Sequence, residues 1–302
     1  MTLREQVAHA TERLVQAGVE GPEAVADAEL LARHVLGWDR ARYLVRRRDA
    51  VPDHFDGAYR PLIDRRVRRE PISLITKRRE FWGLEFEIKP GVLTPRPETE
   101  LIIEASIDLI DTCIDAPLSV ADIGTGSGCL AVALATTFRH ATICAVDMSA
   151  AAVALARQNA SAHGVADRVS VVDAPFSDWF TRRAVERPNK NFDLIVANLP
   201  YIPTRDIQTL PPEVRLYEPA DALDGGPDGL APLRLFLEVV PPCLKSDGVL
   251  IVEIGAGQDR GLTQAVASTP GLCLKEFRSD LQGIRRAAVI APLAKTPTKT
   301  RT

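Results

Sequence analysis

The sequence has little of what builds disulfide frameworks, metal sites or membrane spans. It holds five cysteines in 302 residues, widely spaced and without a Cys-x-x-Cys pair, which argues against a disulfide framework and a zinc site. Its five histidines show no helical pairing with carboxylates or cysteines, so we predict no metal. No apolar run approaches the roughly 18 to 20 residues of a membrane span, and the amino terminus lacks a signal-peptide stretch. We therefore expect a cytoplasmic protein with no membrane partner.

What is present is the composition of an ordinary soluble globular protein. The apolar fraction is 46% and the charged fraction 25%, and 302 residues suit two domains. The formal net charge is only −3, but residues 39–80 hold thirteen Lys or Arg against seven Asp or Glu, an excess of six. The arginine clusters at residues 46–48 and 65–66 fit an acidic partner or RNA, or else a solvated basic helix face.

The chain shows four regions of different pattern. Apolar positions at helical spacing predict a small helical domain at residues 1–70. Residues 71–95 alternate apolar with polar positions and contain a Pro-Gly turn signal, which predicts a β-hairpin linker. Residues 96–291 alternate helical patterns with short β-branched runs, which is typical of a parallel sheet covered by helices on both faces. Residues 292–302 are rich in Pro, Thr and Lys, and we expect them to be disordered.

Seven strands are expected in the third region. The last two are separated by a polar, glycine-containing stretch and fit a closing antiparallel hairpin. The seven strands are residues 118–122, 141–147, 168–173, 192–198, 249–253, 272–277 and 286–290.

A glycine-rich turn follows the first of these strands and opens the helical pattern at residues 129–137. Glycine lets the backbone turn tightly and approach a ligand without hindrance from a Cβ atom. The dinucleotide fingerprint would place a third glycine at Cys129, so the pattern disfavours NAD and FAD, whereas S-adenosylmethionine has no phosphate to bind. The residues of the turn are Gly124, Thr125, Gly126, Ser127 and Gly128.

Asp147 ends the second strand, 23 residues after Gly124. A carboxylate in this place meets the hydroxyls of a bound ribose, which indicates a nucleoside ligand. The alternative is a cap for the helix expected at residues 149–162, although Ser149 is already well placed to cap it.

Asn198, Leu199, Pro200 and Tyr201 stand at the carboxyl end of the fourth strand, where open α/β sheets bind their ligands. A planar amide nitrogen is a poor nucleophile because its lone pair is delocalised, so two acceptors that hold both of its hydrogens help to aim it. The Asn198 side-chain oxygen and the main-chain carbonyl of Leu199 are suitable acceptors, and Tyr201 can stack on the flat group. The motif predicts methyl transfer to a planar nitrogen; a simple Asn-x-Pro turn is the alternative.

These motifs resemble the HemK/PrmC family, protein-glutamine methyltransferases that modify class I peptide chain release factors. The resemblance implies the class I S-adenosylmethionine-dependent methyltransferase fold, a Rossmann-like seven-stranded sheet with its last strand antiparallel, behind an all-helical substrate-docking domain. It implies that the methyl acceptor is the glutamine of the Gly-Gly-Gln loop. Besides the motifs above, the resemblance is carried by residues 27–31, 79–82, 93–100 (Leu-Thr-Pro-Arg-Pro-Glu-Thr-Glu), 213–219 and 222–226.

The chain departs from the family pattern in three places. Leu199 replaces the usual proline, and the start of the hairpin has Leu74 and Lys77 where the family usually has Tyr and Gly. Phe176 and Trp179 both compete to line the adenine, and spacing favours Phe176. The predicted catalytic residues are Asn198, Leu199, Pro200 and Tyr201, and the predicted cofactor contacts are Gly124, Thr125, Gly126, Ser127, Gly128, Asp147, Phe176 and Asn198.

Two other functions compete with this one. Asn-Leu-Pro-Tyr also occurs in enzymes that resemble ribosomal RNA adenine dimethyltransferases, so the alternative substrate is an adenine amino group of rRNA or DNA. A nucleic-acid enzyme should have a basic catalytic domain, whereas the positive excess here precedes that domain. The third reading is a cofactor-binding scaffold without activity, against which the intact Asn198 and Asp147 argue.

Overall fold

The computed structural model describes residues 1–110, 116–188 and 191–293, and the chain forms two compact units. The first, here called the helical unit, comprises Met1–Arg78, Ile88–Pro90 and Pro211–Tyr217. The second, the sheet unit, comprises Arg79–Glu87, Gly91–Leu210 and Glu218–Thr302. The helical unit thus extends beyond the expected boundary at residue 70 and includes a short segment from the second half of the chain. Of the tail expected to be disordered, residues 294–302 lie outside the described residues.

The helical unit buries the apolar faces of its helices against one another. Its first helix begins at a capping box, in which the Thr2 hydroxyl accepts from the Glu5 N–H and the Glu5 carboxylate accepts from the Thr2 N–H. Its second helix ends at Gly37, whose φ of 62° gives the left-handed cap that glycine adopts without strain. The helices are α1 (Leu3–Gln16), α2 (Gly21–Leu36), α3 (Arg40–Arg46), α4 (Phe55–Val67), α5 (Ile72–Thr76) and α10 (Pro212–Tyr217).

Arg66 of α4 explains why α10 belongs to this unit. The side chain is 1% exposed and donates to Asp27 at 2.6 Å, to Glu213 at 2.7 Å and to Glu23 at 2.9 Å. Arg69 also donates to Glu213, at 2.6 Å. A buried guanidinium is tolerated only with such partners, because removing a charge from water is costly. The cluster therefore holds a helix that lies 147 residues further along the chain.

The two arginine clusters noted in the sequence have different surroundings. Arg65 pairs with Glu70 and Arg66 is buried, so neither an external partner nor a solvated helix face describes the second cluster. In the first cluster, Arg46 and Arg48 are exposed, and Arg46 pairs with Asp49 at 3.0 Å.

The segment expected to be a hairpin begins with the short helix α5. Lys77 ends this helix with a φ of 60°, in the left-handed region that favours glycine. This is the position where the family usually has glycine, so the turn is kept and the lysine adopts it with some strain.

The hairpin itself is formed by β1 (Arg78–Phe81) and β2 (Leu84–Glu87). Trp82 and Gly83 connect the strands with φ values of 54° and 69°, and a two-residue turn with positive φ at both positions suits the twist of a hairpin. The Glu80 carboxylate accepts from the Gly83 N–H at 2.7 Å and closes the turn.

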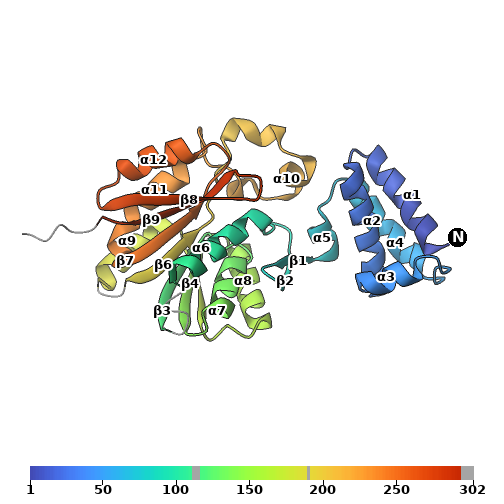
Figure 1. Ribbon diagram of the computed structural model, residues 1–302, viewed down its shortest axis with the longest axis horizontal. Helices are drawn as coiled ribbons and strands as arrows, with labels where there is room; N and C mark the ends of the chain where they lie inside the picture. Colours follow the sequence, from blue (N-terminus) through green and yellow to red (C-terminus); the bar gives the residue numbers. More distant parts are fainter. Residues whose placement is uncertain (111–115, 189–190, 294–302) are drawn as a thin grey trace, which may run out of the picture. The chain divides into compact units, whose positions relative to one another are not determined.

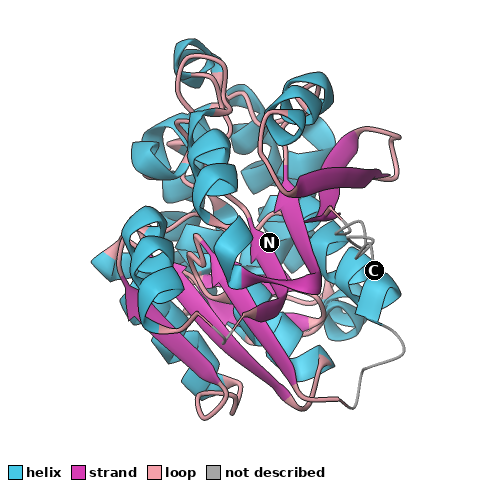
Figure 2. Ribbon diagram, turned by 90° about the vertical axis from the view of Figure 1, so that its left-hand side faces the viewer, coloured by secondary structure: helices cyan, strands magenta, loops and turns pink. Residues whose placement is uncertain are grey.

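The sheet unit is organised around seven strands, and the predicted fold class is confirmed. The order across the sheet is β5-β4-β3-β6-β7-β9-β8, and β9 runs antiparallel to both of its neighbours. Figure 2 shows these strands in magenta with helices packed against them. The strands are β3 (Leu118–Ile123), β4 (Ala141–Asp147), β5 (Val169–Asp173), β6 (Phe192–Ala197), β7 (Leu244–Glu253), β8 (Leu272–Ser279) and β9 (Arg285–Pro292).

Helices cover both faces of the sheet (Figure 1). On one face α6 (Glu100–Ile110) contacts α7 (Cys129–Thr137), which contacts α8 (Ala150–Ala162). On the other, α11 (Ala231–Val239) contacts both α9 (Phe176–Glu186) and α12 (Asp259–Ala267). No helix in the described part of the chain is long and apolar enough to cross a bilayer. Short 3-10 helices are η1 (Pro97–Thr99), η3 (Thr204–Thr209), η4 (Ala220–Ala222) and η5 (Pro241–Cys243).

Candidate active site

A cavity of about 350 Å³ lies at the carboxyl ends of β3, β4 and β6. Parallel strands end at one edge of the sheet, so turns that are distant in sequence meet there. All of the lining residues belong to the sheet unit. The predicted site residues among them are Gly124, Thr125, Gly126, Ser127, Asp147, Phe176, Asn198, Leu199 and Pro200, and further lining residues include Thr94, Arg96, Thr99 and Asp221.

The glycine turn brings the end of β3 close to the end of β6. Gly124, Gly126 and Gly128 have φ values of 71°, 55° and 81°, in the left-handed region. A Cβ on Gly124 would lie 3.2 Å from the carbonyl oxygen of Asn198. A Cβ on Gly128 would lie 3.0 Å from Ala156 of α8. The first glycine is thus required by the approach to Asn198 and the third by helix packing.

Asp122, the penultimate residue of β3, holds this turn through hydrogen bonds. It is fully buried, and its Oδ2 accepts from the Thr125 hydroxyl at 2.6 Å and from the Ala131 N–H at 3.1 Å. Burial raises the pKa of its carboxyl to about 7. No role was predicted for this residue, although a carboxylate two residues before the first glycine of the turn was a usable signal.

The Asp147 carboxylate lines the cavity and is held by two backbone groups. Its Oδ2 accepts from the Gly126 N–H and its Oδ1 from the Ser149 N–H, both at 2.9 Å. The cap of α8 is Ser149 itself, whose hydroxyl accepts from the Ala152 N–H. Asp147 is therefore not the helix cap, and each of its oxygens keeps a lone pair for a ligand hydroxyl.

The two aromatic residues that compete for the adenine lie in different places. Phe176 is part of the cavity wall and packs edge-on against Phe236, with ring centroids 5.7 Å apart. Trp179 packs against Phe180 and Phe192, with centroids at 4.8 and 5.9 Å. Of the two rings, that of Phe176 lines the cavity.

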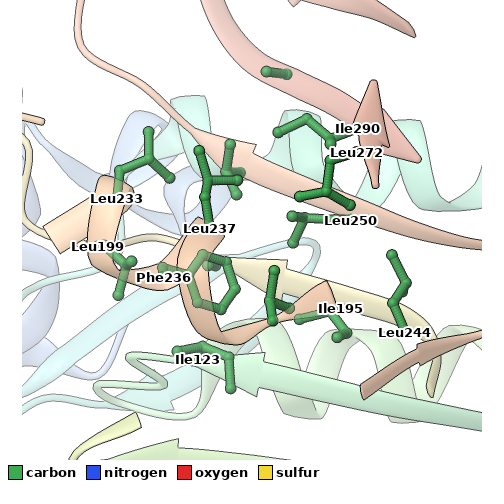
Figure 3. Close-up of a cluster of buried hydrophobic side chains, with 14 of the residues drawn as sticks. Ile123, Ile195, Leu199, Leu233, Phe236, Leu237, Leu244, Leu250, Leu272 and Ile290 are labelled. Atoms are coloured by element: carbon green, nitrogen blue, oxygen red, sulfur yellow. The ribbon is translucent and has the colours of Figure 1, made fainter. Parts of the chain in front are cut away.

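Asn198 is the first residue after β6 and lines the cavity together with Leu199 and Pro200. The Leu199 side chain is 7% exposed and packs in the hydrophobic core near Leu233 of α11 (Figure 3). A leucine side chain has no polar atom, so a polar contact of Leu199 with a guest is made by its main chain. The Tyr201 phenol donates a hydrogen bond to the Glu253 carboxyl. Burial raises the pKa of the phenol, and the neighbouring carboxyl raises it further.

Comparison with known proteins gives this site its family. Residues 5–76 match the family model described as the PrmC N-terminal domain, and residues 99–213 match that of ribosomal protein L11 methyltransferase (PrmA). The chain is 40% identical over 285 residues to the release factor glutamine methyltransferase of Rhodospirillum rubrum, covering 94% of this chain and 83% of that protein. It is 40% identical over 273 residues to the enzyme of the same name from Geobacter sulfurreducens, covering 90% of each.

The chain belongs to the HemK/PrmC family of release factor glutamine methyltransferases. It is therefore a methyltransferase. Among solved structures, the catalytic domain of hMettl16 in complex with the MAT2A 3'UTR hairpin 6 has a TM-score of 0.52 at 17% identity, covering 70% of this chain and 76% of that chain. At this identity the likeness concerns the fold alone.

The string Pro-Arg-Pro-Glu-Thr-Glu, which carries the family resemblance, connects three parts of the sheet unit. Arg96 donates to Glu218 at 2.6 Å, and the Glu100 carboxylate accepts from the Trp82 N–H of the hairpin at 2.8 Å. Thr99, between them, donates to Glu253 at 2.6 Å. The string is evident in the sequence but these contacts are not, because each partner is distant along the chain.

The segment that follows the Asn198 motif pairs with residues 223–226 further along the chain. Ile202 donates from its N–H to the Leu223 carbonyl at 3.0 Å and accepts from the Gly225 N–H at 2.8 Å. The chain just before these residues carries Pro219 and Asp221 to the cavity wall. This arrangement accounts for the family strings at residues 213–219 and 222–226, which the sequence alone did not explain.

Within the described residues, no group of three or more His, Cys, Asp or Glu side chains is arranged to hold a metal ion.

Proposed function

We propose that this enzyme transfers a methyl group from S-adenosylmethionine to the side-chain amide nitrogen of the glutamine in the Gly-Gly-Gln loop of class I peptide chain release factors. The observation that carries the proposal is Asn198 on the wall of a glycine-turn cavity, in a chain 40% identical to relatives named for this reaction. The helical unit would serve to dock the release factor. Such a substrate would place the enzyme in the cytoplasm.

Three features of the cavity support an adenosyl cofactor. The left-handed glycine turn leaves room where side chains would stand, Asp147 offers carboxylate lone pairs to ribose hydroxyls, and Phe176 offers an aromatic face to adenine. Thr125 and Ser127 complete the turn on the same wall. When bound, S-adenosylmethionine would supply the methyl group of its sulfonium: the sulfur–methyl bond would break as the nitrogen–methyl bond forms, neutral S-adenosylhomocysteine would leave, and the nitrogen would lose one hydrogen as a proton to solvent.

The residues at the end of β6 would orient the acceptor. The Asn198 side-chain oxygen takes one hydrogen of the glutamine amide, and the main-chain carbonyl of Leu199 takes the other, which turns the nitrogen toward the methyl group. Pro200 fixes the backbone that presents this carbonyl. The replacement of the family's proline by Leu199 fits a main-chain role, because the leucine side chain packs in the core. Tyr201 supports the arrangement through its bond to Glu253.

The proposal is tested by mass spectrometry of a release factor incubated with enzyme and S-adenosylmethionine. We expect a single added methyl group on the loop glutamine. Methyl groups on RNA in the same reaction, with none on the release factor, would favour the adenine alternative, and no methylation of either would favour the inactive scaffold.

The role of Asn198 is tested separately by Asn198→Ala. We expect turnover to fall by at least about 10²- to 10³-fold, as for the loss of one preorganised hydrogen-bonding group in an active site. Cofactor affinity, measured by calorimetry, should stay close to that of the wild type. Unchanged turnover would remove the proposed role.

A further inference from the structure

Glu253 is a buried carboxyl that the acceptor geometry does not itself use. It ends β7, which pairs in parallel with β6 so that Val252 lies opposite Ala197. This register places Glu253 beside Asn198, at the edge where the cavity opens. Glu253 is 4% exposed, and burial raises the pKa of its carboxyl to about 7.

A short chain of hydrogen bonds joins Glu253 to Asn198. The Thr99 hydroxyl donates to Glu253 Oε2 at 2.6 Å, and Asn198 Nδ2 donates to Thr99 Oγ1 at 3.1 Å. Thr99 is 3% exposed, so water does not compete freely for this hydroxyl. Tyr201 adds a second donor to the same carboxyl.

We propose that Thr99 and Glu253 are positioning residues that fix which atom of the Asn198 amide faces the methyl acceptor. The inference rests on the proposed function and deepens it. A carboxylate only accepts hydrogen bonds, and a hydroxyl has a single hydrogen to give. Once Thr99 gives that hydrogen to Glu253, its oxygen is left to accept, so it pairs with the nitrogen of the Asn198 amide. The amide oxygen is then presented to the guest.

Protonation of Glu253 allows the direction of these hydrogen bonds to reverse. A protonated Glu253 donates to Thr99, whose own hydrogen becomes available to the Asn198 side-chain oxygen. The amide then turns its NH₂ group toward the acceptor NH₂, and two donors face each other. The ionised carboxylate excludes this reversed order, and no proton of Glu253 takes part in the methyl transfer.

Several charged and titratable groups face Glu253 and set its ionisation. Glu98 of η1 opposes the negative charge, whereas Arg286 of β9 favours it. The Tyr201 phenol and the Thr99 hydroxyl stabilise the carboxylate by donating to it.

The decisive comparison is between Thr99→Val and Thr99→Ser. Valine has nearly the shape of threonine without the hydroxyl, and serine keeps the hydroxyl. We expect Thr99→Val to lower kcat about 100-fold, the usual cost of a misplaced active-site group, and Thr99→Ser to stay within about threefold of wild type. Ser106→Ala is the matched control, because it removes a buried hydroxyl that donates to the Ile102 carbonyl of its own helix. Its kcat should equal that of the wild type.

The pH profile of kcat separates positioning from a merely structural role. Wild type and Thr99→Ser should lose activity as the pH falls below about 7, where Glu253 takes up a proton. Thr99→Val should be slow at every pH and should lack this acid limb, because the link between Glu253 and Asn198 is cut. Thermal unfolding and calorimetric affinity for S-adenosylmethionine, measured for each variant, should match the wild type. If Thr99→Val does not fold, Thr99→Ala takes its place.

Three results would overturn the inference: wild-type kcat in Thr99→Val, a kcat in Thr99→Ser as low as in Thr99→Val, or an unchanged acid limb in Thr99→Val. Failure of the proposed function looks different. If the wild type methylates an RNA adenine and not the release factor, the Thr99 comparison repeated with that acceptor still decides the positioning role, whereas methylation of neither substrate overturns both proposals.

Discussion

Each unit of the molecule contains a buried ionisable side chain, Arg66 in the helical unit and Glu253 in the sheet unit, and the two have partners of different kinds. Arg66 of the helical unit is 1% exposed and is surrounded by the carboxylates of Asp27, Glu23 and Glu213. Glu253 of the sheet unit is 4% exposed, and its direct partners are two hydroxyl groups. The first charge is neutralised by carboxylates in direct contact, whereas the second is held by two hydroxyl dipoles, with Arg286 contributing without a direct bond.

This difference separates a group that holds structure from a group that can respond. A buried charge with opposite charges around it stays ionised over the whole physiological range, and the hydrogen bonds to Asp27 and Glu213 raise the pKa of Arg66 despite the opposing effect of burial. A buried carboxyl with neutral partners titrates near neutrality, so its environment decides its state. In the helical unit the buried polar groups bond one another. At the cavity, polar side chains keep hydrogen-bonding capacity for a ligand.

The largest effect is expected when Arg66 is removed from its buried cluster. We expect Arg66→Ala to destabilise the helical unit by about 3 to 5 kcal/mol, because Asp27 is left buried without a partner. Hydrogen exchange of the α2 and α4 amides measures this loss. The matched control is Arg13→Ala, which breaks the exposed pair with Asp64 and should cost at most about 1 kcal/mol. Equal costs for the two variants would show that the buried cluster contributes no special stability.

The buried carboxyls of the sheet unit predict a dependence of its stability on pH. The pKa of Asp122 is raised by burial from 3.8 to about 7, so between these values the folded state binds more protons than the unfolded state. The free energy of unfolding should therefore fall as the pH rises from about 4 to 7, by on the order of 4 kcal/mol for this group.

Asp122→Asn isolates the contribution of this one group, because all other titrating groups remain. Chemical denaturation at pH 5 and pH 8 should show a smaller loss of stability for the variant than for the wild type. If both lose the same stability over this interval, Asp122 is already ionised at pH 5.

The sequence predicted what is local and missed what is distant. The strands, the glycine turn, Asp147 and the Asn198 motif follow from short patterns, because strand-end turns are encoded within a few residues. Membership of α10 in the helical unit depends on Glu213 and Arg66, which are 147 residues apart. The support of the site depends on Thr99 and Glu253, which are 154 residues apart.

The predicted start of β7 was wrong for a local reason. The expected strand began at residue 249, because residues 245–248 read Lys-Ser-Asp-Gly and resemble a turn. In the structure β7 begins at Leu244, which pairs with Phe192 across an irregularity in the register. Neighbouring β6 extends the strand through residues whose own propensity opposes it.

A smaller effect is expected for Asp147→Ala, which tests whether polar groups at the cavity serve binding instead of folding. Loss of ribose hydrogen bonds to a carboxylate should weaken S-adenosylmethionine affinity by roughly 1.5 to 3 kcal/mol per bond. Calorimetry measures the affinity, with Asp173→Ala as control, because Asp173 is the exposed register partner of Asp147 on β5. Undiminished affinity in Asp147→Ala would contradict the role.

The smallest effect is expected at Lys77, where the helical unit gives way to the hairpin. A lysine with a φ of 60° carries about 1 kcal/mol of backbone strain, which Lys77→Gly relieves, although the flexibility of glycine in the unfolded chain offsets part of the gain. We expect a stabilisation of at most about 1 kcal/mol in hydrogen exchange of α5, with kcat unchanged. Lys77→Ala keeps the strained φ and should give no gain. Equal stabilisation by both variants would trace the effect to the lysine charge, beside Arg78 and Arg79, and not to the backbone.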